Sequence, residues 1–106
     1  MQMHEKDYLA DMYRDPYFPD FLVDKIKALL KEVVALLESG ESDLEVIQAA
    51  FDKATIGINE LEEEFDDNDS EIETAARESI GETVDLILAH YKVAIDCEEA
   101  IREREW

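Results

Sequence analysis

The chain is poor in the residues that cross-link or interrupt a fold, and it has no long apolar run. Its 106 residues include one cysteine, two prolines and three glycines. The single Cys97 excludes an internal disulfide framework and any Cys-x-x-Cys site, which is typical of a reducing compartment. No stretch approaches the ~18 apolar residues that a membrane-spanning helix needs, and the first seven residues lack the apolar run of a signal peptide. We therefore expect a cytoplasmic protein of bacterial type.

Positive charge is scarce as well, above all in the middle of the chain. The formal net charge is −19, from 29 acidic and 10 basic residues. Residues 41–82 hold fifteen Asp or Glu against only two bases, Lys53 and Arg77. A surface this anionic repels nucleic acid and anionic lipid and attracts cationic partners. We expect no nucleic acid and no membrane among its partners, and a basic protein is the partner that the charge favours.

The hydrophobic content is high enough for a folded core despite this charge. Hydrophobic residues make up 46% of the chain, too many for an obligatorily disordered acidic sequence. The length suits a single domain over residues 1–106. The acidic side chains should therefore form a hydrated surface around a packed interior.

Helical periodicity runs through most of the sequence. A short helix is predicted over Glu5–Tyr13, ending before Asp15-Pro16 because the residue before proline avoids helical geometry. A second begins near Asp20 and ends at Ser39-Gly40. The apolar positions of the second helix and of the two that follow recur every three or four residues, which predicts one buried face on each. These faces comprise Leu22, Ile26, Leu29, Val33 and Leu36; then Leu44, Ile47, Phe51, Ala54, Ile58, Leu61 and Phe65; then Ile72, Ala76, Ile80, Val84, Ile87 and Tyr91.

Two capping boxes are predicted to open the third and fourth helices, at Ser42–Glu45 and at Ser70–Glu73. A break near residues 92–95 should precede a short terminal helix from Asp96 to about Arg104. Short connections force sequential helices antiparallel. The fold class predicted is all-α, an up-down helical bundle of three long helices with short N- and C-terminal helices.

Two glycines lie at similar heights in the predicted hairpin of the third and fourth helices. Gly57 precedes the turn by about as many residues as Gly81 follows it. Glycine inside a helix costs about 1 kcal/mol relative to alanine. We therefore expect close backbone packing there, or a groove that receives a large side chain from elsewhere.

Motifs for catalysis or cofactor binding are weak in this sequence. A di-iron bundle needs Glu-x-x-His, but Ile87 stands three residues before His90, so His90 is read as a half-exposed polar residue. Asp67, Asp69, Glu71, Glu73 and Glu78 match an EF-hand frame, but Ile72 occupies the position that needs glycine. Acidic neighbours should raise the pKa of Cys97 and suppress its thiolate. We expect no enzyme activity, no cofactor and no dedicated metal site.

The acidic and aromatic clusters are the remaining candidates for function. Acids at the C-terminal end of the third helix oppose the helix dipole, which leaves two interpretations, a solvated helix end or a surface selected to bind cations. Five of the nine aromatic residues fall within residues 8–21. They predict a lid over one end of the bundle, joined by Trp106, or a partly exposed protein-binding patch. These five are Tyr8, Tyr13, Tyr17, Phe18 and Phe21.

Two segments resemble a family of small bacterial proteins of unknown function, DUF5713. They are residues 12–19, Met-Tyr-Arg-Asp-Pro-Tyr-Phe-Pro, and residues 70–78, Ser-Glu-Ile-Glu-Thr-Ala-Ala-Arg-Glu, with the ending Arg-Glu-Trp at 104–106. The resemblance implies an all-helical domain and carries over no activity, cofactor or site residue. Within it, Arg77 is read as an ion-pair anchor that ties Glu73 to the connector near Asp15 or Tyr17, or else as part of an exposed binding face.

We interpret the protein as a noncatalytic interaction module that binds a basic protein surface, of inhibitor, immunity or adaptor type. A small-molecule or metal-binding bundle with a pocket beside Gly57 and Gly81 is the alternative. A structural homodimer is a third possibility, so the chain is expected to be a monomer or a small homo-oligomer. The residues predicted to bind the partner are Glu62, Glu63, Glu64, Asp66, Asp67, Asp69, Glu71 and Glu73.

Overall fold

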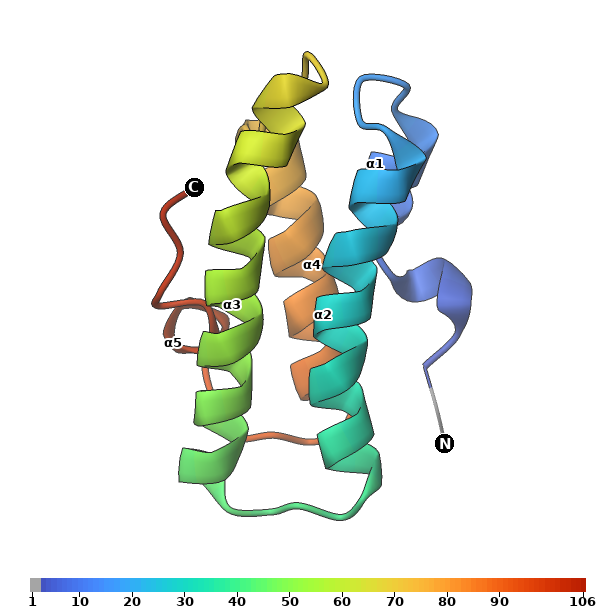
Figure 1. Cartoon of the computed structure of the whole chain (residues 1–106). Coiled ribbons are helices and arrows are strands. Elements are labelled where there is room, and N and C mark those ends of the chain that lie inside the picture. Colours follow the sequence, from blue (N-terminus) through green and yellow to red (C-terminus); the bar gives the residue numbers. More distant parts are fainter. Residues whose placement is uncertain (1–2) are drawn as a thin grey trace.

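The computed structural model describes residues 3–106 and consists of helices joined by short connections (Figure 1). Three long helices, α2 (Asp20–Glu38), α3 (Leu44–Asp67) and α4 (Thr74–His90), run alternately down, up and down. No strand occurs within residues 3–106. The predicted all-α up-down bundle is confirmed. None of the helices in this range is long and apolar enough to cross a membrane.

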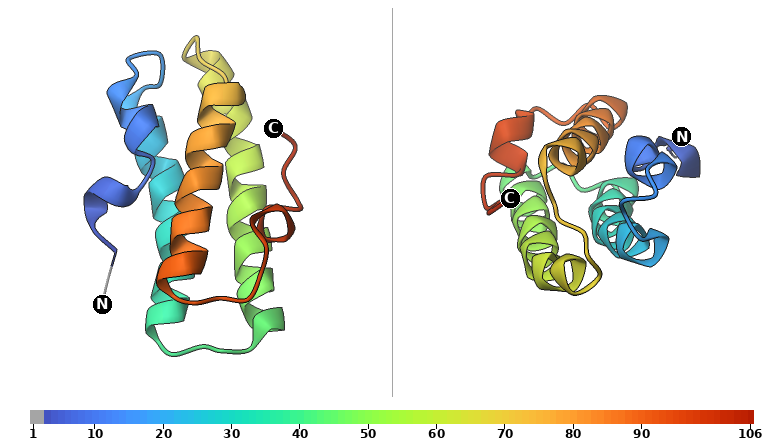
Figure 2. Two further views of the ribbon diagram at one scale, coloured as in Figure 1. Left: turned by 180° about the vertical axis from the view of Figure 1, so that it is seen from behind. Right: turned by 90° about the horizontal axis from the view of Figure 1, so that it is seen from above.

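Short elements cover the long helices on two opposite sides (Figure 2). A 3-10 turn, η1 (Glu5–Asp7), and helix α1 (Ala10–Arg14) precede the bundle, and α1 packs against α2 and α4. At the other terminus, α5 (Cys97–Ala100) packs against α3 and α4. The first described elements and the C-terminal end therefore lie on different sides of the bundle, and Trp106, the last residue, does not join the N-terminal aromatic residues as predicted.

The core follows the predicted periodicity, with a wider buried face on α2. Leu22, Ile26 and Val33 are buried as expected, whereas Leu29 and Leu36 are only half-buried. Because the N-terminal segment covers a second side of α2, four more of its residues are buried, Val23, Leu30, Val34 and Leu37. On α3 the predicted face is buried or half-buried except Leu44, which is 44% exposed at the first turn.

The ends of the helices differ from the prediction in several places. The first predicted helix is interrupted because Leu9 adopts a left-handed conformation, with φ of 52°. The N-cap of helix α3 is Asp43, one residue after the predicted Ser42, and its side chain accepts a hydrogen bond from the Glu45 amide. The first capping box is therefore wrong. Helix α4 starts at Thr74 with Glu73 as an N-cap that makes no side-chain cap bond, so the second capping box is also wrong.

The C-terminal ends of the long helices are closed by left-handed residues. Gly40 takes this conformation after α2, as predicted, and Asp69 and Lys92 take it after α3 and α4. The Ser70 amide donates to the Phe65 carbonyl at 2.9 Å and the Val93 amide to the Leu88 carbonyl at 2.9 Å. These bonds define Schellman motifs. The break after α4 is confirmed, and the helix beyond it, α5, is shorter than predicted because the chain continues as turns.

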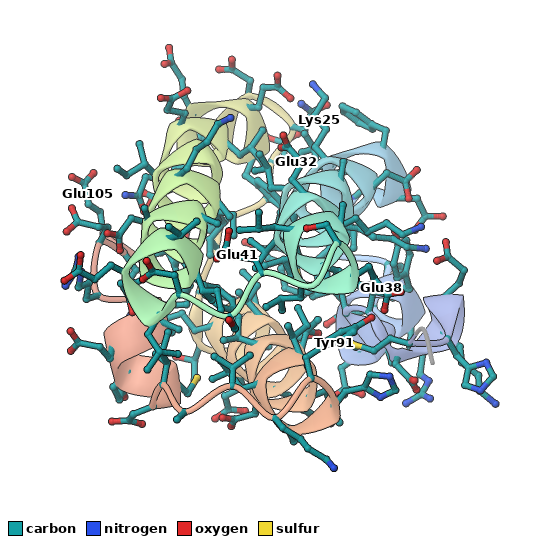
Figure 3. The ribbon with its side chains drawn as sticks, turned by 90° about the horizontal axis from the view of Figure 1, so that it is seen from below. Lys25, Glu32, Glu38, Glu41, Tyr91 and Glu105 are labelled. Atoms are coloured by element: carbon teal, nitrogen blue, oxygen red, sulfur yellow. The ribbon has the colours of Figure 1, made fainter. Side chains whose placement is uncertain are left out.

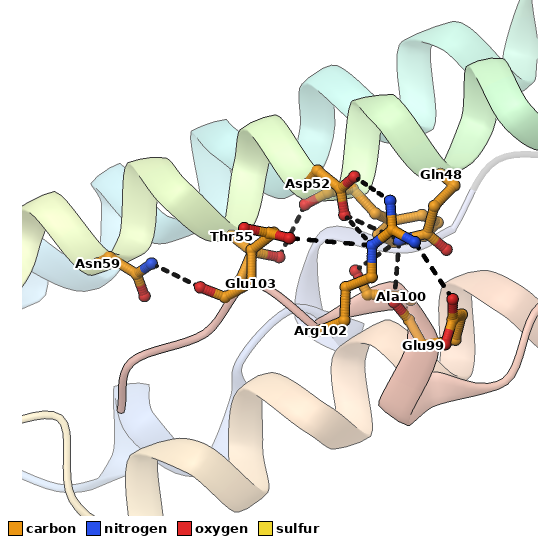
Figure 4. Close-up of polar contacts among 9 residues, drawn as sticks. Gln48, Asp52, Thr55, Asn59, Glu99, Ala100, Arg102 and Glu103 are labelled. Atoms are coloured by element: carbon orange, nitrogen blue, oxygen red, sulfur yellow. Dashed lines mark hydrogen bonds and ion pairs between the residues drawn. The ribbon is translucent and has the colours of Figure 1, made fainter.

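The C-terminal segment is attached to α3 by a polar network (Figure 4). The Arg102 guanidinium donates two hydrogen bonds to the Asp52 carboxylate, of 3.1 and 2.7 Å. Gln48 donates to the Glu99 carbonyl, and Asn59 both donates to the Glu103 carbonyl and accepts from the Glu105 amide. These contacts join residues about fifty positions apart in the sequence.

Candidate functional site: an acidic end with exposed aromatic residues

The structure places the predicted acidic residues at one end of the bundle. They occupy the last turns of α3, the connection that follows and the approach to α4 (Figure 1). The connector between α1 and α2 lies at the same end. None of the eight predicted residues is buried: Glu62 and Glu64 are half-buried, and Glu63, Asp66, Asp67, Asp69, Glu71 and Glu73 are exposed.

These carboxylates do not form one flat face, because consecutive helical residues point about 100° apart. Glu64 faces α2, where its Oε2 atom lies 2.7 Å from Lys25 Nζ. Glu62, Glu63 and Asp66 follow Asn59 at helical spacing, and Asn59 binds the C-terminal segment. The predicted site is therefore divided between the α2 side and the C-terminal side of α3.

The aromatic cluster is divided between the core and the surface. Tyr8 and Phe18 are each only 2% exposed, and Tyr13 is half-buried with its hydroxyl bonded to Asp24. Tyr17 is 40% exposed and Phe21 50% exposed. Phe18 and Tyr13 are covered at this end as the lid prediction requires, whereas Tyr8 is covered farther along α2, beside Lys27 and Lys31. Tyr17 and Phe21 remain on the surface at the acidic end.

Electrostatic contacts connect the two exposed aromatic residues to the acidic residues. Lys25 Nζ lies 5.9 Å from the centre of the Phe21 ring while it pairs with Glu64. Desolvation and then the negative charges of Glu73 and Glu71 raise the pKa of Tyr17. We call the surface formed by Tyr17, Phe21, Glu64, Glu71 and Glu73 the aromatic-acidic edge.

Arg77 does not act as the predicted ion-pair anchor. Its guanidinium donates to the hydroxyl of Thr74, one turn earlier in α4, at 3.0 Å. Among the described residues no carboxylate lies within ion-pair distance of Arg77. Because α4 starts only at Thr74, Glu73 precedes the helix and does not stand one turn below Arg77 on its surface.

The two helical glycines do not pack against each other. A Cβ atom on Gly57 would lie 2.9 Å from Leu29 Cδ2 of α2, whereas one on Gly81 would have no atom within 4 Å. Gly57 thus receives a side chain from another helix, which was the second of the two predicted reasons. A shallow hollow beside it is lined by Leu29, Ala49, Asp52, Lys53, Ile56 and Glu60, and Gly81 takes no part in it.

Cys97 lies against the backbone of α4, and His90 lies against the ring of Tyr91. Burial, followed by the charge of Asp85, raises the pKa of Cys97 to about 11, in the predicted direction. Its Sγ atom lies 3.6 Å from the Gly81 carbonyl oxygen. His90 is exposed and stacks edge-on against Tyr91, with ring centres 4.8 Å apart. Over residues 3–106, no three His, Cys, Asp or Glu side chains converge to hold a metal ion.

The aromatic-acidic edge contains two residues that were not among the eight predicted. A signal for Phe21 was present, because it lies outside the apolar stripe of α2 and one turn before Lys25, on the hydrated side of that helix. Tyr17 was predicted only as a member of the aromatic cluster, in either a lid or an exposed patch, because a connector without periodicity does not show which of its side chains stay in water. The neighbourhood of Tyr17 and Glu73 arises only when the connector and the α3–α4 connection meet.

The fold and this surface define the protein as a small acidic all-α bundle with exposed aromatic residues beside its acidic end. The chain belongs to DUF5713, a family of unknown function, whose model matches residues 2–106. The resemblance inferred from the two sequence segments is thereby confirmed. A search of curated proteins and a search of solved structures each found no match.

Proposed function

We propose that the protein is a noncatalytic interaction module whose aromatic-acidic edge binds a basic surface on another protein, in the manner of an inhibitor, immunity or adaptor protein. One observation carries the proposal: Tyr17 and Phe21, both exposed, share the end of the bundle at which the acidic residues collect. Hydrated carboxylates alone give little affinity. Exposed aromatic side chains supply the apolar area that anchors an interface.

The net charge of the chain favours a cationic partner. A net charge of −19 disfavours self-association and steers cationic surfaces toward the protein. Among residues 3–106, Lys25 is the base that forms an ion pair with the edge, and Glu64 already neutralises it. A partner with Lys or Arg around an apolar centre complements this surface, and its cations would pair with Glu71 and Glu73 beside Tyr17.

Calorimetry with a designed amphipathic helical peptide, rich in Lys and Leu, tests the proposal. The protein should bind the peptide at low ionic strength, and the affinity should fall as the salt concentration rises. The Tyr17→Ala/Phe21→Ala variant should bind the peptide about tenfold or more weakly than the wild type does. Leu86→Ala is the matched control, because Leu86 is 41% exposed on α4 and lies outside the edge; its affinity should equal that of the wild type.

A charge control completes the test. The double substitution Glu71→Gln/Glu73→Gln should weaken peptide binding more than Glu45→Gln/Glu82→Gln does. The second pair removes the same charge from exposed positions elsewhere. Equal weakening by the two pairs, or no binding to the wild-type protein at low ionic strength, would contradict a docking role for the edge.

A further inference from the structure

A hollow lies at the opposite end of α2 from the aromatic-acidic edge, beneath the N-terminal segment. Its volume is about 390 Å³, within the usual range of small-ligand sites. Glu38, at the end of α2, and Tyr91, just after α4, lie side by side at this end of the bundle (Figure 3). The residues that line the hollow are Met3, Glu5, Tyr8, Lys31, Val34, Ala35 and Glu38.

The hollow carries an uncompensated negative charge. The Glu5 carboxylate is matched by two lysines of α2, since its oxygens lie 3.0 Å from Lys27 Nζ and 2.7 Å from Lys31 Nζ. Both lysines also lie within 6 Å of the Tyr8 ring centre, which holds them beside Glu5. Within the described part of the chain, Glu38 has no lysine or arginine at ion-pair distance.

The hollow also contains the hydroxyl group of Tyr8, which has no hydrogen-bond partner among the described residues. Tyr8 is only 2% exposed yet lines the hollow, and no residue within 3–106 accepts from or donates to its hydroxyl. Burial, then the charges of Glu5 and Glu38, raises the pKa of Tyr8. The group is therefore protonated at neutral pH, and its oxygen is available to accept a hydrogen bond from a ligand in the hollow.

Tyr91 faces the same carboxylate from the other side. Burial, then the neighbouring Glu38, raises the pKa of Tyr91 to about 12. Its hydroxyl is buried and has no hydrogen-bond partner within residues 3–106. The acceptors open in the hollow are the carboxylate oxygens of Glu38 and the oxygen of Tyr8.

We propose that this hollow binds a primary alkylammonium group, with the ammonium between the Glu38 carboxylate and the Tyr8 hydroxyl. The three N–H donors of such a group match these acceptors. Its alkyl chain lies against the apolar wall formed by Met3, Val34 and Ala35. An anion is disfavoured, because Lys31 is already committed to Glu5. The site is independent of the aromatic-acidic edge, since the two lie at opposite ends of the bundle.

Two sources can supply an alkylammonium group, a free amine and the lysine side chain of a partner. Calorimetry and NMR titration of the full chain with n-butylammonium probe the first, and Nα-acetyl-lysine methylamide probes the second. Binding of either supports the site, and the tighter ligand identifies the source. The methyl signals of Met3 and Val34 should shift in the titration, whereas n-butanol, which has the chain without the charge, should leave them unchanged.

Three variants test the assignment of residues. Glu38→Gln should weaken the binding by about tenfold or more, since a charge-assisted hydrogen bond is lost, and Tyr8→Phe should weaken it without change in net charge. Glu32→Gln is the matched control, an exposed acid on the same helix outside the hollow, and should bind as the wild type does. Full affinity in both Glu38→Gln and Tyr8→Phe, or no shift of the methyl signals with either ammonium probe, would overturn the proposal.

Discussion

The backbone amide of Leu9 donates a hydrogen bond of 2.9 Å to the hydroxyl of Thr83, 74 residues away and in the centre of α4. Both residues are buried, and Leu9 holds a left-handed conformation that leaves its amide outside any helix. Thr83 in turn donates to the Ser79 carbonyl at 3.0 Å. This one hydroxyl therefore explains why the N-terminal helix breaks where it does and how it is fixed to the bundle.

Thr83→Val should destabilise the protein by about 1–3 kcal/mol, because the buried Leu9 amide loses its acceptor. Thr55→Val is the matched control: Thr55 is equally buried and also donates to the carbonyl one turn earlier, but it accepts from no amide. Urea denaturation of both variants measures the difference. Similar free energies of unfolding for the two would show that the Leu9 amide does not depend on Thr83.

Arg102→Ala should release the C-terminal segment from α3 with only a small loss of stability. The pair with Asp52 is bidentate, which strengthens it, but Arg102 is 46% exposed and water screens part of the attraction. Amide exchange at Glu103 and Glu105 should rise in this variant. Arg14→Ala, which removes a 77% exposed partner of Asp11, should change neither exchange nor the melting temperature.

The same pair predicts a dependence of stability on acidity. Burial raises the pKa of Asp52, but the hydrogen bonds from Arg102 and Gln48 outweigh it, and the net pKa lies below its ordinary value of 3.8. The stabilisation is thus fully present above that value and is lost as pH falls through the lower pKa of the folded protein. Between neutral pH and pH 3, the difference in unfolding free energy between wild type and Asp52→Asn should shrink. A difference that grows in acid would contradict this sign.

Gly81→Ala should stabilise the protein by about 0.5–1 kcal/mol, because alanine favours the helix and its Cβ would meet no atom within 4 Å. Gly57→Ala should gain less or lose stability, since the new Cβ would lie 2.9 Å from the tip of Leu29. Thermal denaturation of both variants tests the ranking. A higher melting temperature for Gly57→Ala than for Gly81→Ala would contradict the placement of the two residues.

Cys97 should react slowly with alkylating agents at neutral pH. With a pKa of about 11 against an ordinary 9.0, its thiolate population is roughly a hundredfold lower, and the thiolate is the reacting form. The rate of iodoacetamide labelling should keep rising above pH 9. Asp85→Asn removes one of the charges responsible and should raise the rate at pH 8, whereas Glu45→Gln, on another helix, should not. A rate that levels off near pH 8 would be incompatible with these surroundings.

Local patterns in the sequence predicted most of the secondary structure and the core. The spacing of Ile47, Phe51, Ala54 and Ile58 placed one face of α3 in the core without reference to any partner helix. The capping boxes failed because each helix starts later than its box predicts: the N-cap of α3 is Asp43, one residue after Ser42, and that of α4 is Glu73, three residues after Ser70. The sequence pattern left two interpretations each for Arg77 and for the two glycines. Their neighbours depend on helix rotation and on the true start of α4, which the pattern does not define to one residue.

The candidate sites could be predicted only in part. Acidic residues at the end of α3 and in the following connection must lie together because they are close in sequence. The addition of Tyr17 and Phe21 to that end required the antiparallel return of the chain. The hollow combines Tyr8 and Glu38, with Tyr91 beside Glu38; these residues are far apart in the sequence and share no motif, so no pattern could have found it.

The sequence by itself determined an all-helical bundle, its core faces and its concentration of negative charge, because these depend on periodicity and composition along short stretches of chain. The tertiary structure decided where the N-terminal segment breaks, which aromatic residues stay in water, and which hydroxyl and carboxylate groups share a hollow. These outcomes depend on which surfaces meet, and a buried amide such as that of Leu9 finds its acceptor only when two distant segments pack together.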